Sequence, residues 1–193
     1  DVDPAAVQDC KCAVRWLKMN ARKYNIDPGK IAVIGGSAGG HLSMMLGYTD
    51  DPALEGNSGH NGVSSSVSAV VNIYGVYDMT ARIAKENDAV KNFLQGKSFE
   101  EAPELYRQAS PMFHLDQTDP PTLILHGTLD EIVPVAQSDR LASHLKRLKI
   151  PYTYGRLDGW PHTMDLAKPV NDYCQAMIDR FLYEHLPMPR NKD

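Results

Sequence analysis

Apolar residues follow two alternating patterns along the 193-residue chain. Short runs rich in β-branched residues predict buried strands, and longer stretches with apolar residues at every third or fourth position predict amphipathic helices. The expected strands lie near residues 31–35, 68–74, 121–126 and 152–156. The expected helices cover residues 4–24, 37–48 and 134–149, and a last helix ends near residue 186. Strands that alternate with helices in this order indicate an α/β fold with a mostly parallel sheet.

The apolar faces of these helices indicate how they pack. The first helix is expected to begin with Asp3 as its cap and Pro4 in its first turn. Its face toward the sheet consists of Val7, Cys10, Val14, Leu17, Ala21 and Tyr24. The two later helices are expected to bury Leu141, Leu145 and Leu148, and Val170, Tyr173, Met177, Ile178 and Phe181. Residues 50–66 predict a surface loop rather than a linker, so residues 1–193 are expected to form a single domain.

The stretch between the second and third strands departs from this alternation. Two amphipathic segments, 81–95 and 99–108, lie where a simple crossover would carry one helix. Because loops at the carboxyl ends of strands commonly carry function, we expect residues 79–113 to form a small helical cap over the site. The alternative is a plain crossover helix with an extra turn. Asp78, just before this stretch, is expected to hold a turn by accepting backbone N–H bonds.

A single serine lies among glycines at the junction of the first strand and the following helix. The segment reads Gly-Gly-Ser-Ala-Gly-Gly-His over residues 35–41. In this context G-x-S-x-G is typical of a nucleophile elbow, a sharp turn that strains the serine backbone. Ser37 is the candidate nucleophile, and Gly35 and Gly39 are expected to let strand and helix approach closely. The glycine spacing fits neither a phosphate loop nor a dinucleotide loop, although ordinary strand-to-helix turns also carry such glycines.

Candidates for the other two members of a serine triad follow in the required order. Folds that use such an elbow place the acid and then the histidine after the serine, each on a loop that follows a later strand. The strand at 121–126 leads to Asp130, and the strand at 152–156 leads to His162. Asp130 is therefore the candidate acid and His162 the candidate general base.

Other residues compete for these two roles. Asp130 is also placed to cap the helix that follows it, which is a common role for aspartate. Asp158 and Asp165 flank His162 in sequence and are alternative partners for its imidazole. His114 is the nearest rival histidine, but it precedes the strand that leads to Asp130 and so breaks the chain order.

Together these motifs resemble a known family. They are G-G-S-A-G-G-H at 35–41, Y-G-x-x-D at 74–78, A-S-P at 109–111, P-P-T-L-I-L-H-G-T-L-D at 120–130 and G-W-P-H at 159–162. The chain resembles the hormone-sensitive-lipase-like branch of the α/β-hydrolase esterases, and within it the bacterial carbohydrate-ester esterases of acetyl-xylan and feruloyl type. The resemblance implies a three-layer fold, in which helices flank a mostly parallel sheet and a small helical cap is inserted.

The resemblance also implies parts that this sequence does not contain. Members of this branch carry four further strands and a His-Gly-Gly-Gly loop upstream of the elbow, and no such loop occurs here. We therefore expect the chain to correspond to the C-terminal two-thirds of such an esterase. Of the implied oxyanion hole it retains the backbone N–H of Ala38, and losing one such donor typically costs about 100- to 1,000-fold in turnover. The elbow strand would form a sheet edge, covered by an upstream segment or used for homo-oligomerisation.

The candidate residues specify a chemistry. His162 would deprotonate Ser37, Asp130 would orient the imidazole, and an acyl-serine would form from a small-molecule or carbohydrate ester. These groups suffice for the reaction, so no cofactor and no metal is expected. His41 and Trp160 are candidates for the substrate pocket. Two alternatives remain: a serine peptidase of the prolyl-oligopeptidase type, and a non-catalytic module inactivated by loss of the oxyanion loop.

The composition of the chain limits the kinds of molecule that it is expected to bind. Twenty basic and 24 acidic residues give a net charge of −4, so the chain has no excess of basic charge with which to bind nucleic acid. Hydrophobic residues make up 42% of the chain, as in a soluble enzyme, and no apolar run is long enough to insert into a membrane. No targeting segment opens the sequence, which leaves the compartment unknown. Cys10, Cys12 and Cys174 lack zinc-site spacing and are expected to be neutral thiols.

Overall fold

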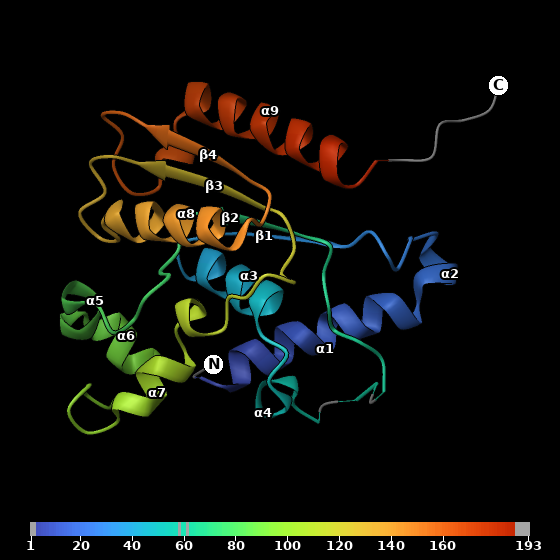
Figure 1. Cartoon of the computed structure of the whole chain (residues 1–193), viewed down its shortest axis with the longest axis horizontal. Helices are drawn as coiled ribbons and strands as arrows, with labels where there is room; N and C mark the ends of the chain where they lie inside the picture. Colours follow the sequence, from blue (N-terminus) through green and yellow to red (C-terminus); the bar gives the residue numbers. More distant parts are fainter. Residues whose placement is uncertain (1–2, 58, 61, 188–193) are drawn as a thin grey trace.

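A four-stranded parallel sheet with the strand order β1-β2-β3-β4 forms the centre of the molecule (Figure 1). The structure is a computed structural model that describes residues 3–57, 59–60 and 62–187. The strands are β1 Ala32–Gly36, β2 Ala69–Ile73, β3 Thr122–Gly127 and β4 Tyr152–Leu157. All four sequence-based strands are confirmed, and every pairing between them is parallel. The loops that follow the strands therefore meet at one edge of the sheet.

Helices cover both faces of the sheet, as the three-layer prediction requires (Figure 1). Helices α3 (Ala38–Tyr48) and α8 (Ala136–Leu148) lie on one face, and α9 (Lys168–His185) lies on the other. Successive side chains of a strand point to opposite faces of the sheet, so each strand packs against both helix layers. Val70 and Ile124 point into the α3/α8 layer, whereas the neighbouring Val71, Leu123 and Leu125 pack under α9.

The first predicted helix is wrong in three details. It is divided at Asn20 into α1 (Ala5–Met19) and α2 (Ala21–Tyr24), and Asp3 makes no capping bond. Helix α1 packs mainly against α3 and the short α4 (Pro52–Glu55), so that α3 separates most of it from the sheet. Val7 and Val14 are buried as predicted, but Tyr24 is exposed. The predicted apolar face thus contacts α3 and α4 at Val7, and it reaches the edge of the sheet at Val14, which packs with Ile31 and Val33.

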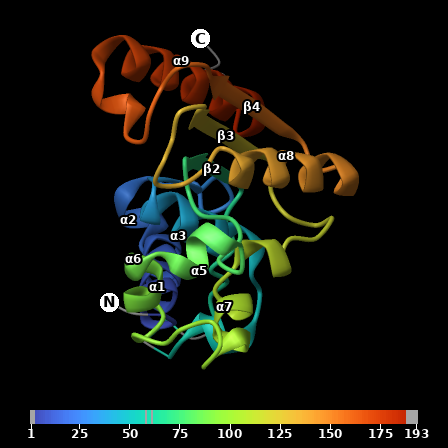
Figure 2. The ribbon, with the colours of Figure 1, turned by 90° about the vertical axis from the view of Figure 1, so that its left-hand side faces the viewer.

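Residues 79–113 form a separate layer with a small core of its own. The layer contains α5 (Arg82–Glu86), α6 (Asp88–Phe93), α7 (Pro103–Gln108) and a 3₁₀ turn, η1 (Pro111–Phe113). Met79, Val90, Leu94 and Tyr106 are buried together inside it. Figure 2 shows these helices gathered beside α3 and away from α9. The segment predicted as one helix over 81–95 is therefore two short helices.

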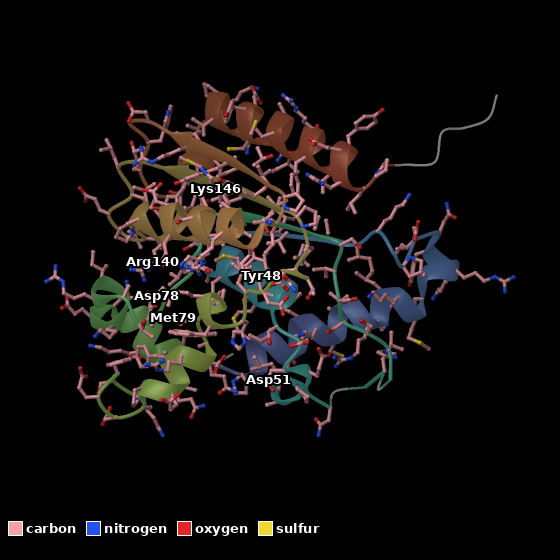
Figure 3. The ribbon with its side chains drawn as sticks, viewed as in Figure 1. Tyr48, Asp51, Asp78, Met79, Arg140 and Lys146 are labelled. Atoms are coloured by element: carbon pink, nitrogen blue, oxygen red, sulfur yellow. The ribbon has the colours of Figure 1, made fainter. Side chains whose placement is uncertain are left out.

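Asp78 ties this layer to the sheet. Its Oδ1 accepts bonds from the backbone N–H and the hydroxyl of Thr80, which confirms the predicted turn. Its Oδ2 pairs with Arg140 of α8, and the two labelled side chains lie side by side in Figure 3. Gln137 of α8 accepts the Tyr77 and Asp78 N–H groups through its Oε1. The layer is consequently fixed at its base to α8.

Strand β1 lies at the edge of the described sheet. Its central residue Ile34 is 55% exposed, whereas every residue of β2 and β3 is buried. The edge expected from the sequence is therefore present among the described residues. Within the same residues, no helix has both the length and the apolar character that crossing a bilayer requires.

Candidate active site

Ser37 occupies a strained turn between β1 and α3. Its φ of 55° and ψ of −117° lie outside the regions that most side chains adopt, as expected for a nucleophile elbow. The Ser37 N–H donates to the Ile73 carbonyl of the neighbouring strand at 2.9 Å. This bond fixes the turn against β2 and leaves the hydroxyl beyond the end of the sheet.

Two glycines let the elbow close, but one of them differs from the prediction. A Cβ on Gly35 would lie 2.3 Å from the backbone of Gly39, so the close approach predicted at Gly35 is present. A Cβ on Gly39 would meet nothing within 4 Å, so Gly39 itself does not need to lack a side chain. The second tight contact is at Gly40, where a Cβ would lie 2.6 Å from Asn72 Oδ1. Helix α3 approaches β2 at this point, which spacing within the motif cannot show.

The structure brings Ser37, His162 and Asp130 together from three separate loops. His162 Nε2 lies 3.0 Å from Ser37 Oγ, and His162 Nδ1 lies 2.6 Å from Asp130 Oδ2. Because a carboxylate accepts, the Nδ1–H donates to Asp130 and the free Nε2 can accept the serine proton. The Asp130 side chain is fully buried and that of His162 is 11% exposed, so this pair is largely shielded from water.

The alternative partners for these residues are engaged elsewhere. Asp130 Oδ1 accepts the backbone N–H groups of Ile132 and Val133, inside its own loop and before α8 begins. Asp158 accepts a bond from the Thr128 hydroxyl. His114 Nε2 lies 2.7 Å from the Gln108 carbonyl. Asp130 is therefore not the cap of α8, and neither Asp158 nor His114 takes part in the cluster.

Tyr74, at the end of β2, is a neighbour of this cluster that the sequence analysis missed. Its ring centroid lies 4.6 Å from that of His162, and its hydroxyl donates to Asp165, the other rival partner of His162. Burial and the Asp165 carboxylate both raise the pKa of Tyr74, so the hydroxyl stays protonated. Tyr74 thus supports one side of the imidazole and tethers the loop that carries it. The sequence signals were its place directly after a buried strand and its position in the Y-G-x-x-D motif at 74–78, to which the sequence analysis gave no role for the tyrosine.

An apolar cavity of about 160 Å³ opens beside Ser37. Its lining comprises Ser37, Ala38, His41, Leu42, Val76, Met79, Asn87, Ala89, Val90, Phe93, Ile132 and Val133. Five of these residues, from Met79 to Phe93, belong to the 79–113 layer. Ala38 is the first residue of α3, so its N–H has no acceptor within the helix. The cavity therefore joins an apolar surface to a backbone donor next to the serine.

The structure places the two residues predicted for the substrate pocket in different surroundings. His41 lies in the cavity wall, where it is buried and its Nε2–H donates to the Ala109 carbonyl at 2.7 Å. Burial lowers the pKa of His41 to about 4, so it is neutral near pH 7. Trp160 does not line this cavity. It packs against the core under α9, and its carbonyl accepts the Leu129 N–H.

Sequence comparisons give matches among esterases. The family model described as BD-FAE matches residues 2–145. Esterase LipC of Mycobacterium tuberculosis is 36% identical over 169 residues, which are 84% of this chain and 42% of LipC. The chain spans about two fifths of the length of the curated mycobacterial esterases that it matches.

Solved esterase structures share the architecture. A truncated form of a carbohydrate esterase from gut microbiota superposes with a TM-score of 0.84 at 30% identity, covering 96% of this chain and 70% of that chain. The butyrate-bound esterase Est2 of the Planctomycetes species Thermogutta terrifontis gives a TM-score of 0.81 at 25% identity, covering 100% and 69%. These similarities confirm the fold class predicted from the sequence motifs.

Proposed function

The chain belongs to the BD-FAE family of α/β-hydrolase esterases, and on that premise we propose that it hydrolyses short-acyl carboxylic esters through an acyl-serine intermediate. The observation that carries the proposal is the unbroken hydrogen-bonded chain from Ser37 Oγ through His162 to Asp130, at the mouth of an apolar cavity. In this proposal Ser37 is the nucleophile, His162 the general base and Asp130 the residue that orients it.

The geometry supports each step of the reaction. His162 Nε2 takes the proton of Ser37 Oγ as the oxygen attacks the ester carbonyl, and the Ala38 N–H donates to the developing oxyanion. Asp130 stabilises the imidazolium, which then gives its proton to the departing alcohol. Water, deprotonated by the same nitrogen, attacks the acyl-serine, and the imidazolium returns that proton to Ser37 Oγ as the carboxylic acid is released. Atoms and charges balance without another reactant.

The cavity favours a short acyl group. Its volume of about 160 Å³ is below the roughly 300 Å³ at which pockets for larger ligands begin. Val90 and Phe93 close it on the side of the 79–113 layer, which we propose acts as the cap. The Est2 relative was solved with butyrate, and other relatives are carbohydrate esterases. We therefore propose acetyl to butyryl esters, including acetylated carbohydrates, in preference to feruloyl esters.

Covalent labelling and turnover test this proposal. A fluorophosphonate is expected to label the protein on Ser37, and Ser37→Ala is expected to abolish both the label and the hydrolysis of p-nitrophenyl acetate. Labelling that persists in Ser37→Ala would move the nucleophile elsewhere. Labelling of Ser37 without ester turnover would favour the non-catalytic alternative, and faster cleavage of peptide anilides than of esters would favour the peptidase.

A further inference from the structure

His126, the penultimate residue of β3, lies directly behind the proposed triad. Its side chain is completely buried, and three polar groups surround the imidazole. Nε2 lies 2.8 Å from the Val133 carbonyl and 3.2 Å from Asp130 Oδ2. Nδ1 lies 2.7 Å from Ser138 Oγ, on α8. The proposed reaction has so far assigned no role to this histidine.

The contacts define which nitrogen carries the proton. A carbonyl oxygen can only accept, so Nε2 must be protonated to satisfy Val133. In the neutral ring Nδ1 is then an acceptor, and it takes the proton of the Ser138 hydroxyl. Burial lowers the pKa of His126, which keeps the ring neutral. The Val133 carbonyl therefore fixes the tautomer that presents an N–H to both Val133 and Asp130, and the Ser138 hydroxyl donates to the other ring nitrogen.

This arrangement gives Asp130 Oδ2 two imidazole neighbours. One is the Nδ1–H of His162 at 2.6 Å, and the other is the Nε2–H of His126 at 3.2 Å. A second donor spreads the negative charge of the carboxylate and prevents it from rotating away from His162. It also weakens the hold of Asp130 on an imidazolium, which eases return of the proton to the leaving alcohol.

We propose that His126 is a positioning residue for the triad, which holds Asp130 through its Nε2–H and thereby tunes the basicity of His162. This inference rests on the proposed function. The ionisable and polar groups that face His126 are Asp130 and His162 from the two loops, Ser138 from α8, and Tyr74 from β2 at a ring distance of 6.4 Å. Among these groups, Asp130 is the one through which His126 acts on His162.

Two amide substitutions separate this role from simple packing. Gln places an amide near the Nε2 position of histidine and can still donate to Asp130, whereas Asn reaches only the Nδ1 position beside Ser138. We expect His126→Asn to lower kcat for p-nitrophenyl acetate about 10- to 100-fold with KM nearly unchanged. We expect His126→Gln to stay within about threefold of the wild type, since a donor is kept.

The pH dependence gives a readout that packing alone would not move. Without the second donor, Asp130 binds the His162 imidazolium more strongly. The acid limb of the kcat/KM profile should therefore shift upward by about half a pH unit in His126→Asn and remain in place in His126→Gln. Equal losses in both variants with unshifted profiles would overturn the proposal, and so would wild-type kinetics in both.

NMR titration of the His162 imidazole separates this inference from the proposed function, because it needs no turnover. An upward shift of the His162 titration midpoint in His126→Asn supports the positioning role even if the wild type fails to hydrolyse esters, a failure that would count only against the proposed function. If His126→Asn does not fold, the nitrogen-15 chemical shifts of the His126 ring in the wild type provide the test, because they report which nitrogen carries the proton. A His126 ring protonated at Nδ1 and not at Nε2 would then overturn the proposal.

Discussion

A polar cluster lies at each end of the sheet, and the two clusters differ in their chemistry. The cluster at the amino end is built from opposite charges. The cluster at the carboxyl end is built from hydroxyl and imidazole groups around one carboxylate. At the amino end, Lys11 of α1 is only 1% exposed and donates to the Thr49 carbonyl, Glu55 and Ser65. Glu55 also pairs with Arg15 at 2.9 Å. A cavity of about 270 Å³ adjoins this amino-end cluster.

The difference lies in what each cluster leaves available. Lys11 uses all three of its N–H donors within the protein, and the hydrogen bonds and charges from Lys11 and Arg15 lower the pKa of Glu55 against the opposing effect of burial. In the carboxyl-end cluster, the Ser37 hydroxyl faces an apolar cavity, and its proton can pass to His162. The larger cavity, whose lining is mixed, thus adjoins a structural cluster, and the smaller, apolar cavity adjoins the proposed chemistry. Substitutions at the two ends should therefore affect different measurements.

The largest effect is expected from Asp130→Asn. The amide keeps the shape of the side chain but presents the wrong partner to His162, and kcat/KM should fall about 10⁴-fold. Steady-state hydrolysis of p-nitrophenyl acetate measures this change, with circular dichroism to establish that the variant is folded. Activity within tenfold of the wild type would show that Asp130 does not orient the base.

The elbow glycines follow, because a substitution there affects both activity and stability. In Gly35→Ala the new Cβ would overlap the backbone of Gly39, which cannot move without opening the elbow. We expect a loss of about 2–3 kcal/mol in the free energy of unfolding, with a parallel loss of activity. Gly39→Ala is the matched control, since its Cβ meets no atom and alanine favours a helix. Equal destabilisation of both variants in urea unfolding would contradict the contacts described above.

The buried His41 gives the carboxyl end a pH-dependent stability. Its pKa is about 4 in the folded chain and 6.5 in the unfolded chain, so between these values the unfolded chain binds the extra proton. Stability should therefore fall as the pH drops from about 6.5 to 4, by about 3 kcal/mol in total. Urea unfolding at several pH values, compared with His41→Gln, isolates this contribution from those of other groups. Identical pH slopes in both proteins would refute it.

At the amino end, Glu55→Gln should reduce stability and spare the chemistry. The substitution leaves the Lys11 ammonium buried without its carboxylate, and we expect a loss of about 2 kcal/mol, below the usual cost because Glu55 is partly exposed. Activity per folded molecule should stay within about twofold. Asp172→Asn is the control: it breaks the exposed pair with Lys168 and should change stability by under about 0.5 kcal/mol. A large loss of kcat in folded Glu55→Gln would show that the two ends are coupled.

Local pattern was sufficient to predict the strands and the elbow. The four predicted runs lie where β1 to β4 form, and the apolar runs of β2 and β3 are continuous because those two strands are buried on both faces. The order of Ser37, Asp130 and His162 along the chain was readable for a related reason. Each follows a strand, and parallel strands carry their following loops to the same edge of the sheet.

Contacts between elements were not readable from the chain. Tyr74 lies beside His162 only because the end of β2 and the loop after β4 are neighbours in space. Trp160 was named for the pocket because it lies near His162 in the sequence, but it does not line the cavity beside Ser37, since sequence proximity does not give side-chain direction. The tight approach at Gly40 depends on how closely α3 crosses β2.

The sequence by itself thus determined which segments form strands and helices and in what order the reactive residue types follow them, since periodicity and chain order are local properties. Only the tertiary structure decided which glycine must lack a side chain, which histidine supports the Asp130 carboxylate, and how large the cavity beside Ser37 is. Those features depend on the exact distances between neighbouring groups, which are set only when the strands, loops and helices pack against one another.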